Sequence, residues 1–171
     1  MKFLPFVIAI FLLWSCTIED QPPFENTNDG KTAYEPVLMT RTQLEKSIKV
    51  IAPIEINRPG KIYFKDGFIF LNEKYEGVHI IDNRNPKEPK NVKFIKVPGC
   101  LDMAIKNNTL YVDNAVDLVA IDLSGADFSE VSRQKRVFPE LLPPDMVEMP
   151  LAFSPEKRPA ETFIVSWKKL D

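Results

Sequence analysis

Residues 62–92, IYFKDGFIFLNEKYEGVHIIDNRNPKEPKNV, can be laid over residues 103–131, MAIKNNTLYVDNAVDLVAIDLSGADFSEV. Their turns, short apolar runs and closing aspartates align, and the aspartates Asp82 and Asp122 lie 40 positions apart. A period near 40 with about four short strands is typical of a propeller blade or a related stacked β array. The sequence therefore predicts an all-β, antiparallel fold with about two blade-like copies.

Turn chemistry and alternation support strands joined as hairpins. KDG at 65–67 and KNN at 106–108 are tight-turn sequences, in which Gly67 and Asn108 tolerate positive φ. Asp82 and Asp122 end equivalent strands, where a carboxylate can accept backbone N–H groups in an Asx turn. Alternation demands one buried set in each strand. The residues expected to include the inward faces are Ile69, Leu71, Val78, Ile80, Leu110, Val112, Val119 and Ile121.

Both copies close on an aspartate and a turn, as GVHIID at 77–82 and DLVAID at 117–122. These segments resemble the LVIVD repeat of bacterial surface and periplasmic β-propeller-like proteins, and NPKEP after the first is similar to the turn that follows that motif. The resemblance covers about residues 35–138 and points to LVIVD-repeat lipoproteins of Gram-negative bacteria, whose activity is not established. Members continue through several more repeats. Two blades cannot close a ring, so we expect an open array from a short or truncated member.

The first sixteen residues, MKFLPFVIAIFLLWSC, have the layout of a signal peptide, because Lys2 precedes an apolar run too short for a comfortable membrane span. LWSC at 13–16 resembles the lipobox of bacterial lipoproteins. This implies cleavage before Cys16 and its acylation, which would anchor the chain in membrane lipid, at the surface or periplasmic face of the bacterial outer membrane. The alternatives are an ordinary cleaved signal with an incidental cysteine and an uncleaved N-terminal helix.

Changes in composition divide the rest of the chain. Thr40 and Gln43 match a capping box, and the apolar stripe that follows ends at Pro53, so a short amphipathic helix is expected over about 41–49. The predicted parts are a signal peptide (1–15), a lipidated cysteine with a flexible tether (16–39), the short helix (40–52), two β repeats (53–138), and a proline-rich segment with a C-terminal strand (139–171).

The C-terminal strand raises a packing problem. TFIVSW at 162–167 is too apolar to leave uncovered, and only a proline-rich segment precedes it. Stacked β repeats usually need about three units, because each unit buries its apolar face on a neighbour. We therefore expect this end of the array to stay exposed and to recruit a partner chain or aggregate.

Composition and motifs exclude several functions. A balance of 22 basic and 24 acidic residues, without a clustered basic surface, argues against a nucleic-acid binder. GxGxxG, Walker A, GxSxG, HExxH and CxxC motifs are absent, and the aspartates lack calcium-loop spacing. The sequence therefore predicts no cofactor, no metal site and no catalytic residue. Acylation of Cys16 leaves Cys100 without a partner, so Cys100 is expected to be a free, buried thiol.

Two functions are consistent with these features. The first is a non-enzymatic lipoprotein whose β scaffold mediates binding or assembly at the cell envelope, with a protein or glycan partner. The alternative is an enzyme or accessory protein acting on envelope polysaccharide or peptide through carboxylates such as Glu73, Glu76 and Asp117, which would have to converge. Two minor hypotheses are sugar stacking by Tyr75 or Trp167, and a His79–Cys100 dyad, for which a cross-strand polar role of His79 is the simpler interpretation.

Overall fold

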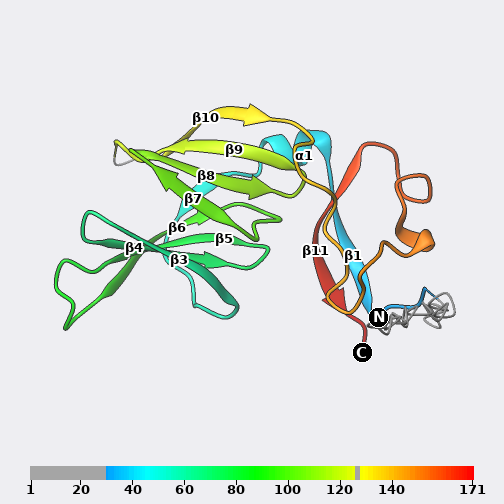
Figure 1. The fold of residues 1–171 in the computed structure, drawn as a ribbon, viewed down its shortest axis with the longest axis horizontal. Helices are drawn as coiled ribbons and strands as arrows, with labels where there is room; N and C mark the ends of the chain where they lie inside the picture. The colour runs from blue at the N-terminus through cyan, green and yellow to red at the C-terminus, as the bar shows by residue number, and fades with distance from the viewer. Residues whose placement is uncertain (1–29, 126–127) are drawn as a thin grey trace, which may run out of the picture.

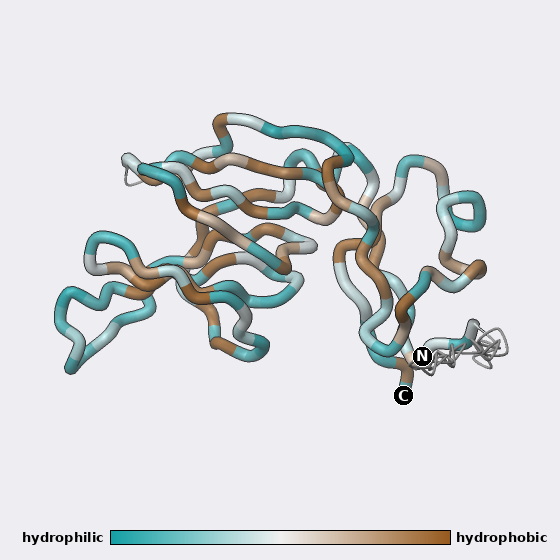
Figure 2. The backbone as a smooth tube through the Cα atoms, in the orientation of Figure 1, coloured by the Kyte–Doolittle hydropathy of each residue, from teal (hydrophilic) through white to brown (hydrophobic). Residues whose placement is uncertain are grey.

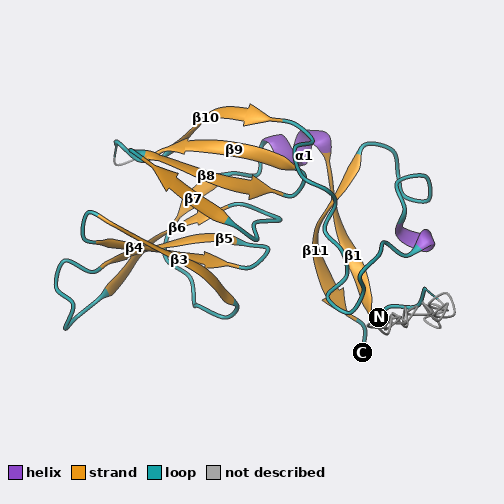
Figure 3. Cartoon of the chain, viewed as in Figure 1, coloured by secondary structure: helices purple, strands orange, loops and turns teal. Residues whose placement is uncertain are grey.

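The computed structural model describes residues 30–125 and 128–171 (Figure 1). The described residues form three antiparallel sheets, one short helix, α1, and a 3-10 turn, η1 (Leu151–Phe153). The fold is therefore all-β and open, as the sequence predicts (Figure 3). The predicted signal peptide, Cys16 and the first part of the predicted tether lie outside the described residues.

The first sheet has five strands in the order β2-β6-β5-β4-β3. They are β2 (Lys49–Ile51), β3 (Pro59–Lys65), β4 (Phe68–Glu73), β5 (Gly77–Asp82) and β6 (Lys90–Lys96). The turn between β3 and β4 places Asp66 and Gly67 at φ of 50° and 79°. Positive φ at both central residues is the requirement of a type I′ hairpin, which explains the KDG sequence.

The second sheet has four strands in the order β10-β9-β8-β7. They are β7 (Met103–Lys106), β8 (Thr109–Asn114), β9 (Asp117–Asp122) and β10 (Ser129–Gln134). The β7–β8 turn differs from the prediction in one detail, because Asn107, at φ of 53°, and not Asn108 takes the left-handed conformation. The strand pairing repeats that of the first sheet: Phe68 lies opposite Asp82 there, and Thr109 lies opposite Asp122 here.

The two sheets stack on one another over a shared hydrophobic core, and apolar residues recur along the strands of both (Figure 2). Tyr63 of β3 reaches across to the second sheet, where its hydroxyl donates a hydrogen bond to the Ile105 carbonyl at 3.1 Å. Burial of this apolar surface is the main stabilising contribution. The core residues are Phe70, Val78, Ile80, Ile95, Val97, Cys100, Met103, Ile105, Leu110, Val112, Val119 and Ile121.

The predicted buried set is nearly correct. Seven of its eight members are buried and Ile69 is half-buried, but both Ile69 and Leu71 point away from the second sheet. Ile69 pairs with Ile81, which is also half-buried, on the face of the first sheet that points away from the second. Consecutive strand residues point to opposite faces, so Phe70 takes the inward position instead.

A two-stranded ribbon of β1 (Tyr34–Thr40) and β11 (Thr162–Lys169) lies beside the stacked sheets (Figure 1). The predicted tether, residues 16–39, is therefore wrong over 34–39, which belong to β1. Asp145 also accepts hydrogen bonds from the Thr32 hydroxyl at 2.5 Å and from the Ala33 N–H at 2.8 Å. The partners lie more than a hundred residues away in the chain, so local composition does not indicate this order.

The predicted helix is present only as one turn, α1 (Arg41–Glu45). Thr40 and Gln43 form the predicted capping box, in which the Thr40 side chain accepts from the Gln43 N–H and the Gln43 side chain accepts from the Thr40 N–H. The predicted extent, residues 40–52, is wrong beyond Glu45. Residues 49–51 form β2 because β6 offers them an antiparallel partner, which overrides the local helical pattern.

The C-terminal strand is covered, contrary to our expectation. Phe163 and Val165 of β11 pack with Leu44 of α1 and with the β8–β9 turn. On the other face of the ribbon, Ile164 and Trp167 pack under the proline-rich segment. That segment supplies the cover because its apolar residues fold back over the ribbon, namely Leu141, Met149 and Phe153.

Candidate functional site

Glu73 is buried at the end of β4. Its carboxylate accepts hydrogen bonds from the backbone N–H groups of Asn57 and Arg58, and one oxygen lies 3.0 Å from Nε2 of His79. Burial raises the pKa of Glu73, but the hydrogen bonds from Arg58, His79 and Asn57 outweigh burial and hold the pKa below its ordinary value. The carboxylate thus fixes the segment that leads into β3.

His79 continues this network on the outer face of the first sheet. Its Nδ1 lies 3.3 Å from the side-chain nitrogen of Asn91, which also donates a hydrogen bond to the Ile54 carbonyl at 3.0 Å. His79 is fully buried and pairs with Leu71 and Phe94. It has the cross-strand polar role that the sequence favours.

Asp117 is the buried centre of a second polar cluster, at the start of β9. It lies 2.5 Å from the guanidinium of Arg41 in α1 and 3.0 Å from that of Arg133 in β10, and it accepts a hydrogen bond from the Arg136 N–H. Burial raises the pKa of Asp117, but the hydrogen bonds from Arg136, Arg41 and Arg133 outweigh burial and lower the pKa. This carboxylate joins the helix to the second sheet.

The three carboxylates named for the enzymatic alternative do not converge on one site. Glu73 and Asp117 lie in different sheets, and hydrogen-bond donors of the protein surround each of them. Glu76 is exposed and pairs with Arg58 at 3.0 Å. The arrangement favours structural roles for these residues over acid–base catalysis.

Cys100 is a free, buried cysteine in the shared core, as predicted. Its sulfur lies 3.2 Å from the Asn72 side-chain nitrogen. Burial, together with the nearby Asp113 carboxylate, raises the pKa of the thiol well above its ordinary value. His79 lies on the opposite face of the first sheet, so the structure brings together no His79–Cys100 dyad.

The two repeat-equivalent aspartates form equivalent Asx turns. Asp82 accepts a hydrogen bond from the Arg84 N–H at 3.1 Å, and Asp122 accepts one from the Ser124 N–H at 2.9 Å. The Arg84 side chain also binds Asp82, and its hydrogen bonds lower the pKa of Asp82 to about 2. Over the described ranges, no group of three or more His, Cys, Asp or Glu residues is placed to hold a metal ion.

The aromatic residues considered for sugar stacking belong to the core of the ribbon. Trp167 is buried and donates its indole N–H to the Leu141 carbonyl at 3.1 Å. Tyr75 packs against the same cluster, and burial raises its pKa. The hypothesis of sugar stacking by Trp167 is therefore wrong, because its ring is not accessible.

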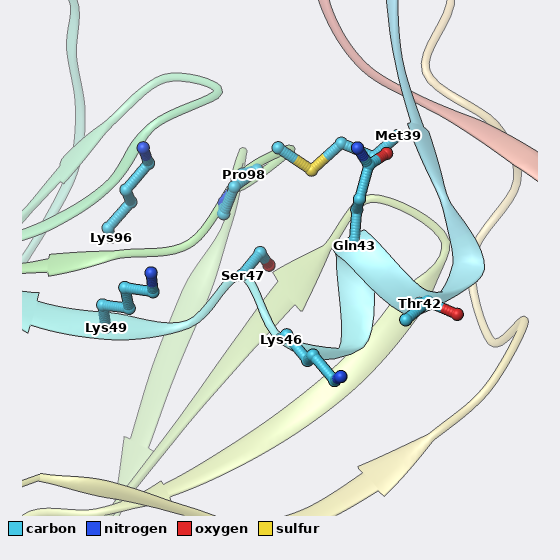
Figure 4. Close-up of a pocket in the computed structure, with 8 residues that line it drawn as sticks. All are labelled: Met39, Thr42, Gln43, Lys46, Ser47, Lys49, Lys96 and Pro98. Atoms are coloured by element: carbon cyan, nitrogen blue, oxygen red, sulfur yellow. The ribbon is translucent and has the colours of Figure 1, made fainter.

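A basic pocket of about 350 Å³ lies between α1 and the outer edge of the first sheet (Figure 4). Lys46, Lys49 and Lys96 line it together with Thr42 and Gln43 of α1, and no acidic residue is among its lining residues. Lys49 lies directly opposite Lys96 in the β2–β6 pair. Like charges in directly opposed positions repel one another, so this pocket favours a negatively charged group.

Replacement of Lys49 with threonine is expected to raise the free energy of unfolding by about 0.5 kcal/mol at low salt, because it removes this cross-strand repulsion. The difference should shrink at high salt, which screens the two charges. Urea denaturation at two salt concentrations measures both effects. Lys106→Thr is the matched control, since Lys106 lies opposite the neutral Thr109. An equal gain in the control would show that strand propensity, and not charge, is responsible.

A larger groove, of about 600 Å³, lies between the second sheet and the residues that follow β10. Its floor holds the Asp113 carboxylate, which accepts hydrogen bonds from the Leu101 and Asp102 N–H groups and whose pKa is raised by burial. At the rim, Lys61 pairs with Asp102 at 2.7 Å. Most of the lining is apolar, and its main residues are Leu101, Ala104, Tyr111, Leu118, Phe138 and Leu142.

This groove was not predicted from the sequence, although a signal was present. Residues 118–121, LVAI, are apolar at four consecutive positions. A continuous apolar run is typical of a strand that is covered on both faces, whereas a strand with one solvated face alternates. The outer face of β9 therefore carries apolar surface beyond what the shared core requires.

Comparisons with protein-family models, with curated proteins and with solved structures find no match to this chain. In the described part of the chain, no helix is long and apolar enough to cross a membrane.

Proposed function

We propose that this chain is a lipid-anchored lipoprotein of the bacterial cell envelope whose stacked sheets form a non-enzymatic scaffold for binding or assembly. The observation that carries the proposal is the apolar groove on the outer face of the second sheet. An apolar face on a rigid sheet suits a protein partner, because its burial requires no new polar contacts. The basic pocket adds a separate site suited to anionic groups.

The buried polar residues support a scaffold over an enzyme. Glu73 and Asp117 have lowered pKa values because protein donors already bind them. General acid–base catalysis needs a group with a pKa near the working pH and within reach of a substrate. Both carboxylates instead hold chain segments together, so they contribute to the rigidity of the scaffold.

The anchor rests on the lipobox resemblance at Cys16 and on the geometry of the ribbon. β1 begins at the end of the ribbon that points away from α1 and the two sheets (Figure 1). A membrane attachment made before β1 would therefore leave the groove accessible. Each buried CH₂ of an acyl chain adds about 0.8 kcal/mol, and two or three chains hold a protein firmly. The proposed site of action is the outer membrane, where membrane lipid is the first partner.

Replacement of Cys16 with serine is expected to move the protein from the membrane fraction to the soluble exported fraction. The fold should be unchanged, because residues 30–125 and 128–171 supply every contact described above. Cell fractionation with mass spectrometry of the N-terminal peptide measures this. An unmodified N-terminal peptide in the membrane fraction of wild-type cells would contradict the anchor, and Cys100→Ser is the control that should leave the location unchanged.

A further inference from the structure

The two stacked sheets contact each other through faces that are not equivalent in the repeat. In the first sheet, one cross-strand row points into the shared core, namely Tyr63, Phe70 and Ile80. The repeat offset of 40 to 41 residues carries this row onto Ala104, Tyr111 and Ala120, which pair across the second sheet in the same way. This second row lies outside the shared core, on the groove side of the second sheet.

On the other face of each sheet, the second sheet is buried where the first sheet is exposed. Met103 and Ile105 of β7 are buried in the shared core. Their equivalents in β3 are Ile62 and Phe64, whose exposed fractions are 64% and 61%. Along β3, the first sheet therefore presents to solvent the face that the second sheet buries.

We propose that a second copy of this chain stacks head to tail on the first, with the outer face of its first sheet seated on the groove side of the second sheet. This inference rests on the proposed function, since it names the partner of the same groove. Within one chain, the two sheets meet through faces that are not equivalent in the repeat. The outer side of each sheet therefore carries the kind of face that its partner sheet uses in the shared core. A contact of that kind is heterologous, and its repetition extends the stack.

The internal contact indicates which residues meet between copies. Tyr63 of β3 reaches Ile105 of β7 within the chain. The equivalents of these two residues on the free faces are Ala104 and Phe64. Ala104 of one copy should therefore lie beside Phe64 of the next.

The open strips on the two faces match in position and in charge. On the first sheet the strip lies over β3 and β4 and consists of Ile62, Phe64 and Ile69. On the second sheet it lies over the equivalent strands β7 and β8 and consists of Ala104 and Tyr111. Neither strip contains a lysine, arginine or carboxylate. The charged residues that line the groove beside the second strip already have partners within the chain, since Asp113 accepts backbone N–H groups, Lys61 pairs with Asp102 and Glu140 pairs with Arg158.

The test uses the full chain extracted in a non-ionic detergent, with two variants at exposed positions, Phe64→Lys and Ala104→Lys. Sedimentation should show wild-type species that grow beyond one chain as concentration rises, while each variant alone stays monomeric. An equimolar mixture of the two variants should form dimers and nothing larger, because one intact face of each kind remains. Thermal unfolding of each variant checks that the fold persists.

Cross-linking gives an independent measurement. Chains carrying Phe64→Cys and chains carrying Ala104→Cys, mixed and treated with a short bis-maleimide, should give a covalent dimer, while either chain alone should not. A wild-type monomer at every concentration would overturn the proposal and leave a different occupant for the groove. Variants that associate like wild type would overturn it as well. The mass of the Cys16 peptide reports the anchor separately, so each proposal can fail without the other.

Discussion

Replacement of Asp117 with alanine is expected to lower the free energy of unfolding by about 3 kcal/mol, because it takes a buried carboxylate away from Arg41, while Arg133 keeps its pairing with Glu130. Arg133 is 7% exposed and Arg41 is 16% exposed in their side chains, and both direct a guanidinium at this carboxylate. The Arg136 N–H would lose its acceptor too. Chemical denaturation at neutral pH measures the change, and the protein should also lose the rigid attachment of α1 to the second sheet.

Glu161→Ala is the matched control. Glu161 pairs with Arg136 at 3.2 Å, but both side chains are largely exposed. Exposed pairs contribute about 0–1 kcal/mol. Similar losses in the two variants would show that Asp117 contributes no more than a surface pair, and would contradict its role in joining α1 to the second sheet.

The repeat was readable from the sequence because local signals agree with one another. KDG fixes a two-residue hairpin through positive φ at Asp66 and Gly67, and the period-two pattern of β8 then assigns its buried face. The error in the buried set lies in β4, where Ile69 and Leu71 face away from the second sheet. Ile69 and Phe70 are both apolar, so alternation alone does not decide which of them faces the second sheet.

In the ribbon and after the short helix, pairing with strands far away in the sequence overrides the local sequence pattern. Thr40 caps α1 as its sequence indicates, but β2 follows directly because β6 is available for pairing. β1 forms because β11 completes it. A hydrogen-bonded partner more than a hundred residues away leaves no mark on the local composition of either strand.

The buried polar residues could not be found from the sequence, for the same reason. Glu73 occupies the strand end that the repeat aligns with Asn114, and the two residues have related roles. Glu73 binds the Asn57 N–H, and Asn114 donates to the Pro98 carbonyl, which lies 41 positions after Asn57. Each fixes the segment that leads into the first strand of its own hairpin, β3 for Glu73 and β7 for Asn114. The alignment pairs these positions, but a carboxylate and an amide give no common motif.

Replacement of Glu73 with alanine is expected to lower the free energy of unfolding by about 3 kcal/mol or more at neutral pH. It leaves two backbone N–H groups and the His79 ring without their acceptor, and each buried unsatisfied donor costs about 1–3 kcal/mol. Urea denaturation measures the loss. Glu76→Ala is the control, since Glu76 is half exposed and pairs only at the surface with Arg58.

The pH dependence separates the carboxylate from simple packing. The pKa of Glu73 in the folded protein lies below its ordinary value of 4.5, so its contribution is present in full above that value and is lost as pH falls through the folded pKa. The difference in stability between wild type and Glu73→Gln should therefore be largest near neutral pH and should shrink below pH 4.5. His79 is the other ionisable side chain in contact with the carboxylate, so His79→Gln should be measured beside it. A difference that stays constant down to low pH would mean that the ionised carboxylate is not what holds residues 54–58 to the first sheet.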